Sequence, residues 1–281
     1  VFTADGSGEL EQRSVSGSDN SSVELGASRV FGSASISDAT SLTNLNADES
    51  APQGSSVLSG SSIQISAIGS MRGLAAASCQ QPSNDFVIVG GSTLAGREAL
   101  MVLTNPSPID ATADLRVFTD LGEVTVSGLS GISVPAQSTT TISLASFAPT
   151  VPSLAVQVQS QGAKLAGWIQ AREVRGTAAA GVDWISPNPQ ASENSVLPGL
   201  VIRGTRVINQ ALRDEENSDA GHALRIFAPE GANVTVQIVS SEADTFGAVF
   251  TGIIEPGTVS NFPINELKDG NYSVFIASDK P

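Results

Sequence analysis

The stretch Arg97–Val124, REALMVLTNPSPIDATADLRVFTDLGEV, decides the fold, because a weaker version of it returns at His222–Ser240 as HALRIFAPEGANVTVQIVS. In each copy a short apolar run ends at a proline, and a polar turn and an alternating strand follow. Alternation with a period of two indicates a strand that buries one face. The alternating apolar residues are Ala113, Leu115 and Val117 in the first copy and Val234, Val236 and Ile238 in the second. The repeat predicts two β-rich units of similar build.

The repeat extends beyond these two stretches. GISVP at Gly131–Pro135 matches GIIEP at Gly252–Pro256, and Ser153–Ser160 matches Asn271–Ser278. All blocks keep the same order, which is hard to obtain by chance although each block alone is weak. We therefore interpret the chain as an internal duplication.

The duplication carries an expectation about the C-terminus. The first copy runs on into a strand at Lys164–Ala171, whereas the second stops at Pro281, where the counterpart of that strand should begin. An unpaired strand edge invites strand addition. We therefore expect a chain that is a fragment of a longer protein, truncated in its second unit, with the edge beside Asn271–Ala277 left open, or else occupied by a foreign strand. Pairing of that edge by residues 197–203 would contradict this expectation.

Short apolar runs recur roughly every 8–12 residues with turn signals between them, which is typical of antiparallel sandwiches. We predict an all-β fold of two tandem Ig-like antiparallel β-sandwich domains related by the internal repeat, with a Ser/Gly-rich N-terminal segment packed on the first. The predicted division is an N-terminal β segment at 1–80 that belongs to the first sandwich, the first sandwich at 81–178, a linker at 179–196 and the second sandwich at 197–281.

Two segments leave alternatives open. Residues 1–62 are rich in Ser, Gly, Asn and Asp. Such a composition fits disorder, but short β-like islands favour thin strands laid over a neighbouring sheet. Leu197–Leu212 starts like a strand, and its second half fits either a strand or one helical turn.

The charge balance excludes some partners. The formal net charge is −14, and only 15% of the residues are charged. A phosphate backbone would be repelled by this surface, so we expect no nucleic-acid partner. The same sign opposes docking on anionic lipid. No apolar run reaches the length of a membrane span. The chain starts at Val1 rather than Met, as expected after removal of a signal or anchor segment or after trimming of the sequence.

The residues that usually carry chemistry are scarce. The chain has one histidine, His222, and one cysteine, Cys79, far apart in sequence. Neither a G-x-S-x-G elbow nor H-E-x-x-H or C-x-x-C occurs. Gly90–Gly96 is glycine-rich, but no Lys-Ser/Thr follows it, so a hairpin connection is the better interpretation than a phosphate loop. We therefore predict no catalytic residues, no cofactor and no enzymatic activity.

Two weaker candidate sites remain. Oxygen ligands for a weakly bound calcium ion are offered by Asp214, Glu216 and Asp219. The 12-residue calcium-loop pattern is absent, however, and a solvated loop is the better interpretation of this acidic run. The tryptophan Trp184 lies in the predicted linker. It either wedges the two units together or caps a glycan groove.

Several blocks resemble a known family. They are CQQPSNDFVIVGGSTLAGREALMVLTNPSPIDATADLRVF, GLSGISVPAQSTTTISL, LAVQVQSQGAKLAGWIQ and GVDWISP. They are similar to an uncharacterised actinobacterial family of secreted or membrane-anchored envelope proteins, catalogued as a domain of unknown function. The resemblance covers about residues 72–281. It implies a β-rich fold, a location outside the cytoplasmic membrane and membrane attachment only through an anchor upstream of Val1. It supplies no catalytic residues.

These observations favour a non-catalytic, extracytoplasmic scaffold or protein-interaction module of the cell envelope that works through sheet edges and inter-strand loops. The alternative hypothesis is a carbohydrate- or cell-wall-binding module. It predicts an exposed aromatic side chain or a polar groove near Trp184 or Asp214–Asp219. The expected partners are envelope proteins or cell-wall glycan.

Overall fold

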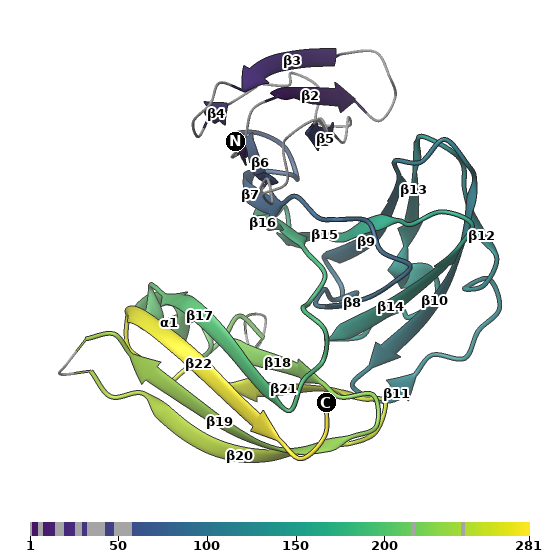
Figure 1. The fold of residues 1–281 in the computed structure, drawn as a ribbon. Coiled ribbons are helices and arrows are strands. Elements are labelled where there is room, and N and C mark those ends of the chain that lie inside the picture. Colours follow the sequence, from purple (N-terminus) through teal and green to yellow (C-terminus); the bar gives the residue numbers. More distant parts are fainter. Residues whose placement is uncertain are drawn as a thin grey trace. The chain divides into compact units, whose positions relative to one another are not determined.

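The computed structural model describes residues 2–4, 8–14, 20–25, 30–32, 43–47, 58–214, 217, 219–242 and 245–281, with side chains from residue 60 onward. Antiparallel strands dominate the described residues (Figure 1), joined by one α-helix, α1 (Thr205–Ala211), and one 3₁₀ turn, η1 (Leu144–Ser146). None of the helices in this part of the chain combines the length and the apolar character of a membrane span.

The N-terminal strands pair among themselves. One sheet has the order β4-β1-β6-β7, and the other has the order β3-β2-β5. Their bounds are β1 Phe2–Ala4, β2 Gly8–Ser14, β3 Asn20–Leu25, β4 Val30–Gly32, β5 Thr43–Ala47, β6 Leu58–Ser66 and β7 Gly73–Ser78. The β-like islands expected within residues 1–62 were Ser22–Leu25, Arg29–Phe31 and Ala34–Ile36. The first lies within β3 and the second overlaps β4, whereas Ala34–Ile36 lies outside the described residues.

Two further sheets build the sandwich that follows. The first has the order β11-β10-β14-β8, with β12 also paired to β10, and the second has the order β13-β9-β15-β16. Their bounds are β8 Asp85–Val89, β9 Arg97–Asn105, β10 Ala111–Thr119, β11 Gly122–Glu123, β12 Ile132–Val134, β13 Ser138–Ser143, β14 Leu154–Gln161, β15 Ala166–Arg175 and β16 Ala178–Ile185.

The alternation in β10 does what the sequence predicts. Ala113, Leu115 and Val117 are all buried, while Arg116 between the last two is exposed and so is Thr112 just before the first. From the facing sheet, β9 buries a continuous run in its C-terminal half, Met101–Asn105, as expected for a strand covered on both sides. Burial of these apolar side chains is the main favourable term that holds the two sheets together.

The last part of the chain forms a four-stranded sheet of order β17-β22-β19-β20 and a two-stranded sheet of β18 and β21. Their bounds are β17 Asn194–Ile202, β18 Ala223–Phe227, β19 Ala232–Ser240, β20 Ala248–Ile254, β21 Val259–Pro263 and β22 Gly270–Ser278. The helix α1 follows β17, and it resolves the open question about Leu197–Leu212 as a strand followed by a helix.

The core of this part lies on the inner face of the four-stranded sheet. Val234, Val236 and Ile238 of β19 are buried, so the predicted alternation is confirmed in the second copy as well. Phe262 of β21 packs against Phe250 of β20 with ring centroids 5.3 Å apart. The inner faces of the two sheets thus share one apolar cluster.

Two expectations are wrong. The predicted linker at 179–196 holds most of β16 and the start of β17, so only residues 186–193 lie between strands. The edge beside Asn271–Ala277 is not open, because β22 lies between β19 and β17 and pairs with both. The partner strand β17 precedes β22 by about seventy residues, and no local pattern reveals such a pairing.

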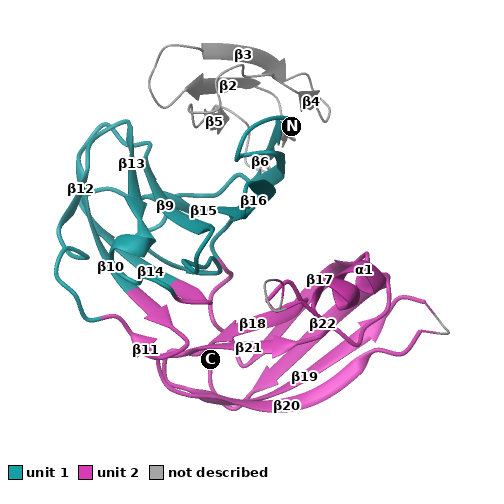
Figure 2. Ribbon diagram, turned by 180° about the vertical axis from the view of Figure 1, so that it is seen from behind, with its two compact units in different colours: residues 1–116, 125–150, 156–187 teal, residues 117–124, 151–155, 188–281 magenta. Residues whose placement is uncertain are grey.

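Contacts divide the chain into two compact units (Figure 2). Unit 1 comprises residues 1–116, 125–150 and 156–187, and unit 2 comprises residues 117–124, 151–155 and 188–281. The strands β10 and β14 each contribute residues to both units. Within unit 2, the ring of Phe118 lies 4.7 Å from that of Phe227, centroid to centroid.

Candidate interaction surface

The outer face of the four-stranded sheet in unit 2 carries apolar side chains that nothing covers. The register places Val196, Phe275, Gln237 and Val249 in one row across all four strands. The exposed fractions are 59% for Val196, 44% for Phe275 and 69% for Val249. Solvent-facing positions of a strand usually carry polar side chains, so these exposed apolar side chains are unusual. We call this row, together with the other outward-facing residues of β17, β22, β19 and β20, the outer face.

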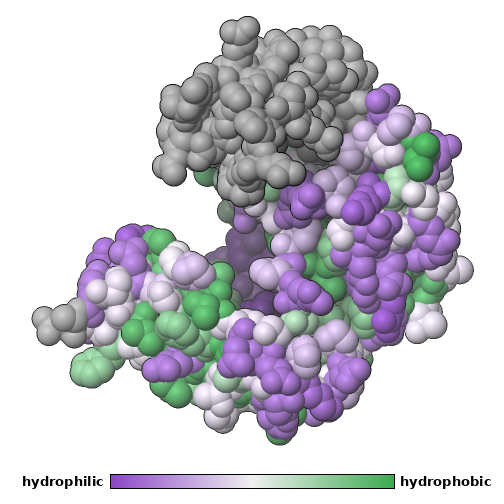
Figure 3. Space-filling model, viewed as in Figure 1, coloured by the Kyte–Doolittle hydropathy of each residue, from purple (hydrophilic) through white to green (hydrophobic). Residues whose placement is uncertain are grey.

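The rest of the outer face mixes apolar and uncharged polar residues. Val239 and Ile253 are exposed, and Thr235 lies opposite Thr251 between them. Hydrophobic residues gather in the part of the space-filling view that corresponds to β17, β22 and β19 (Figure 3). The face thus combines exposed apolar groups with hydroxyl and amide groups and carries no charge among these residues.

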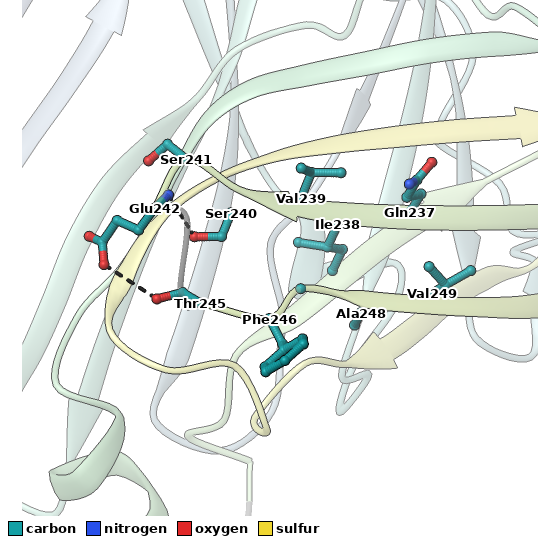
Figure 4. A pocket seen from close by; sticks show the side chains of 11 residues that line it. Gln237, Ile238, Val239, Ser240, Ser241, Glu242, Thr245, Phe246, Ala248 and Val249 are labelled. Atoms are coloured by element: carbon teal, nitrogen blue, oxygen red, sulfur yellow. Dashed lines mark hydrogen bonds between the residues drawn. The ribbon is translucent and has the colours of Figure 1, made fainter.

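The hairpin end of β19 and β20 forms a shallow, open hollow of about 550 Å³ (Figure 4). Phe246 projects from it and is almost fully exposed. The polar rim is tied together by short-range bonds, since the Ser240 hydroxyl accepts from the Glu242 N–H at 3.0 Å and Thr245 Oγ1 donates to the Glu242 carboxylate at 3.4 Å. Such a hollow lacks the enclosure and converging polar groups of a small-molecule site.

The two edge strands of the sheet differ in how they are protected. In β17, Pro198 and Gly199 interrupt the register with β22, and Gly199 has a φ of +74°. A proline and a bulge are devices that discourage strand addition. The other edge strand, β20, has the sequence AVFTGII, with no charge, no proline and no register shift along its ladder with β19. Of the two edges, β20 is therefore the unprotected one.

Trp184 lies in β16 rather than in a linker, opposite Gln170 of β15. Its side chain is half-buried, and its indole N–H donates to Gln64 Oε1 of β6 at 3.1 Å. The β6–β7 hairpin packs here, since a side chain at Gly73 would lie 3.0 Å from Val182. Trp184 therefore joins elements of unit 1, and its hydrogen-bonding group is not presented to a ligand.

The second tryptophan, Trp168, and the single tyrosine, Tyr272, are the other aromatic side chains that carbohydrate-binding modules commonly use, and neither is fully exposed. Tyr272 is almost fully buried in the core of unit 2, and its hydroxyl donates to the Lys268 carbonyl at 2.9 Å. Burial raises the pKa of this phenol, with the Glu242 charge adding to the effect. Trp168 lies in β15, half-buried. The structure does not bring Trp168, Trp184 and Tyr272 together as an exposed planar row.

The acidic loop gives no described metal site. Asp214 and Asp219 lie in turns after α1, whereas Glu216 lies outside the described residues. Backbone bonds from Asn217 N–H to the Asp214 carbonyl and from Ala220 N–H to the Asn217 carbonyl hold the loop locally. No group of three or more His, Cys, Asp or Glu residues placed to hold a metal ion occurs among the residues that the structure describes.

The two residues with intrinsically reactive side chains lie in different surroundings. Cys79 follows β7 at an exposed position, and partial burial of the thiol raises its pKa, which lowers the thiolate fraction that a nucleophile needs. His222 precedes β18, where its carbonyl accepts the Ile264 N–H at 2.9 Å. Its Nε2 is buried without a hydrogen-bond partner among the described residues, as is Oδ1 of Asn265. Neither residue joins a described carboxylate cluster.

These features define a class: an all-β protein of stacked antiparallel sheets whose exposed apolar groups lie on strands rather than in a pocket. The chain belongs to a family of unknown function, DUF5719, whose model matches residues 30–281. The expected resemblance to a domain of unknown function is thereby confirmed. Neither the comparison with curated proteins nor that with solved structures gave a match.

The candidate interaction surface was not among the residues singled out from sequence, although a signal for it exists. In AVFTGII, apolar residues occupy both faces of the strand, whereas a strand with one buried face should alternate. Val249 and Ile253 are the residues that break the alternation. Apolar residues at the outward positions of a short strand are thus the pattern that locates this surface.

Proposed function

We propose that this protein is a non-catalytic interaction module of the cell envelope, placed outside the cytoplasmic membrane, and that it binds other envelope proteins through the strands of unit 2. The observation that carries the proposal is the uncovered outer face together with the unprotected edge of β20. An exposed edge offers unpaired main-chain groups, and neighbouring side chains supply specificity. The extracytoplasmic address and the actinobacterial origin rest on the sequence resemblance alone.

We also propose that residues 81–178 and 197–281 are two copies of one Ig-like unit. The strand orders support this, because β8-β14-β10-β12 in the first corresponds to β17-β22-β19-β20 in the second, and β13-β9 corresponds to β21-β18. One departure from the usual Ig order is common to both. The strand beside β14 or β22 is the first of its unit rather than the last.

The alternative, a cell-wall glycan-binding module, is less well supported. It needs an exposed aromatic platform, but the indole N–H of Trp184 is bonded to Gln64 and Tyr272 is buried. Cys79 belongs to a residue type that often acts as a catalytic nucleophile, but its raised pKa disfavours the reactive thiolate. This favours a binding role for the protein. Binding by strand addition needs no such groups.

Site-specific photo-crosslinking in cells tests the proposed function. A photoreactive amino acid is placed at Val249 or at Val196, and a control at Ile109, an exposed apolar residue of unit 1. We expect discrete crosslinked protein species from Val249 or Val196 and none from Ile109. In parallel, purified protein is mixed with peptidoglycan sacculi. Retention on sacculi that is lost on Trp184→Ala, without protein crosslinks, would replace the proposal with the glycan-binding alternative.

A further inference from the structure

We infer that β20 pairs antiparallel with β20 of a second copy of this chain, about a two-fold axis at Thr251, so that two four-stranded sheets become one continuous sheet. This inference rests on the proposed function and names its partner. A two-fold contact uses the same patch on both copies. The edge must therefore be complementary to itself.

The sequence of β20 is complementary to itself about Thr251. In the paired edge Val249 lies opposite Ile253 of the second copy, and both are 69% exposed on the outer face. Each apolar side chain thereby gains an apolar cross-strand neighbour, a pairing that stabilises sheets. At the axis, Thr251 faces its own copy, and Thr–Thr pairs are among the favourable cross-strand contacts.

The inner face fits the same register. Phe250 lies opposite Gly252 of the second copy, so that the largest side chain of the strand meets the position without one. Within a single chain, position 252 already requires glycine, because a Cβ there would lie 2.4 Å from the ring of Phe262. The Phe262 ring thus occupies the space over Gly252, and the incoming Phe250 would lie beside that ring.

Charge favours this edge as the meeting point of two copies. Each chain carries a formal net charge of −14, so two copies repel each other over most approaches. The strand from Ala248 to Ile254 has no charged residue, and the first acid beyond it, Glu255, lies opposite Gly247 of the second copy. The paired register therefore places no two carboxylates face to face. At the other edge, Pro198 removes a donor and the bulge breaks the ladder.

Thr251→Lys tests the pairing, with Thr235→Lys as its matched control. Both threonines are exposed on the outer face and lie opposite each other in the β19–β20 ladder, but only Thr251 is at the edge. Two lysines would meet at the axis, and like charges directly opposite each other are destabilising. In sedimentation velocity over about a hundredfold range of concentration, wild type should shift from one chain toward two. We expect Thr251→Lys to weaken the association about tenfold or more and Thr235→Lys to leave it near wild type.

Disulfide formation tests the register. In a Cys79→Ser background, Thr251→Cys should form an intermolecular disulfide under mild oxidation, because opposed antiparallel residues lie within disulfide reach. Thr235→Cys should not. A wild type that stays monomeric throughout, or equal disulfide formation from both variants, overturns the inference.

The crosslinking at Val249 separates this inference from the proposed function. Crosslinked species that contain only peptides of this chain support pairing between copies. Crosslinked species that contain another envelope protein, with a monomeric wild type, overturn the pairing and leave the proposed function standing. A monomer without any protein crosslink at Val249 or Val196 contradicts both.

Discussion

Asp269 shows how a single side chain, distant in sequence, fixes a local element. The helix α1 begins after Gly204, which has no side chain to cap it. Asp269 supplies the cap from the segment before β22, because its carboxylate accepts from the N–H groups of Gly204 at 3.0 Å and Thr205 at 2.8 Å and from the Thr205 hydroxyl at 2.5 Å. The N–H of the first helical residue, Thr205, and that of the preceding Gly204 are thereby satisfied.

These bonds give the protein a defined acid sensitivity. The Thr205 hydroxyl, followed by the two N–H groups, holds the pKa of Asp269 at about 2. In the unfolded chain an aspartate titrates near pH ~4. The carboxylate therefore contributes stability above pH ~4, and that contribution is lost as the pH falls through about 2. We predict that Asp269→Asn lowers the thermal midpoint at pH 7 and that the difference from wild type shrinks toward pH ~2.

Asp120→Asn serves as the control for this effect, since Asp120 is an exposed carboxylate in the turn before β11. Thermal melts of the three proteins at several pH values provide the measurement. A difference between wild type and Asp269→Asn that is the same at pH 7 and at pH ~2 would show that the carboxylate charge is not what stabilises the helix start.

Gly96 is a second residue whose role only the structure reveals. It has a φ of +78°, and a Cβ there would lie 2.2 Å from the Val174 carbonyl oxygen, beside the bulge in β15. We predict that Gly96→Ala destabilises the protein by about 1–3 kcal/mol or more, since the clash adds to the backbone strain. Gly176→Ala, at a φ of +57° with nothing within 4 Å, should cost only the strain. Equal losses in chemical denaturation would refute the clash.

Neither residue could be identified from sequence, and the reason is physical. A capping box needs its acidic residue three positions into the helix, whereas Asp269 lies 64 residues from Thr205. The clash at Gly96 depends on Val174, which the sheet brings near. Contacts of this kind depend on the tertiary fold, so a local pattern carries no trace of them.

At the scale of single elements, periodicity predicted the buried strands well. In β19, Ile238 is 2% exposed and its neighbour Val239 is 41% exposed. We predict that Ile238→Ala destabilises unit 2 by about 2–5 kcal/mol, whereas Val239→Ala changes stability by less than about 0.5 kcal/mol. Urea denaturation of both variants provides the test. Comparable losses in the two would mean that the outer face is covered in solution.

Elements that depend on a distant partner were missed. The strand β16 has the sequence AAAGVDWI, whose small residues and glycine suggest a connection. It is a strand because β15 pairs with it along most of its length. The pairing of β22 with β17 was missed for the same reason. Propensity and alternation act locally, whereas the choice of neighbouring strand is made by the whole sheet.

At the scale of the whole chain, sequence predicted the β-rich character and the resemblance to a family of unknown function, but not the residues of the candidate interaction surface. Trp184 was a candidate because aromatic side chains often bind sugars, and Asp214 and Asp219 were candidates because carboxylates bind calcium. The surface described above instead offers main-chain groups and aliphatic side chains. Its most specific feature is the contrast between two edges of one sheet. Pro198 protects β17, and no comparable device protects β20. A strand without protection is where association between chains is expected.

Amide hydrogen exchange along the two edge strands tests this account most directly. Exchange is measured for Ala248–Ile254 and Asn194–Ile202 in dilute and concentrated wild type and in Thr251→Lys. The account predicts that protection of Ala248–Ile254 rises with concentration in wild type but not in Thr251→Lys, while Asn194–Ile202 stays unchanged in both. Exchange from Ala248–Ile254 that is the same at every concentration, or protection that rises only in Asn194–Ile202, would contradict it.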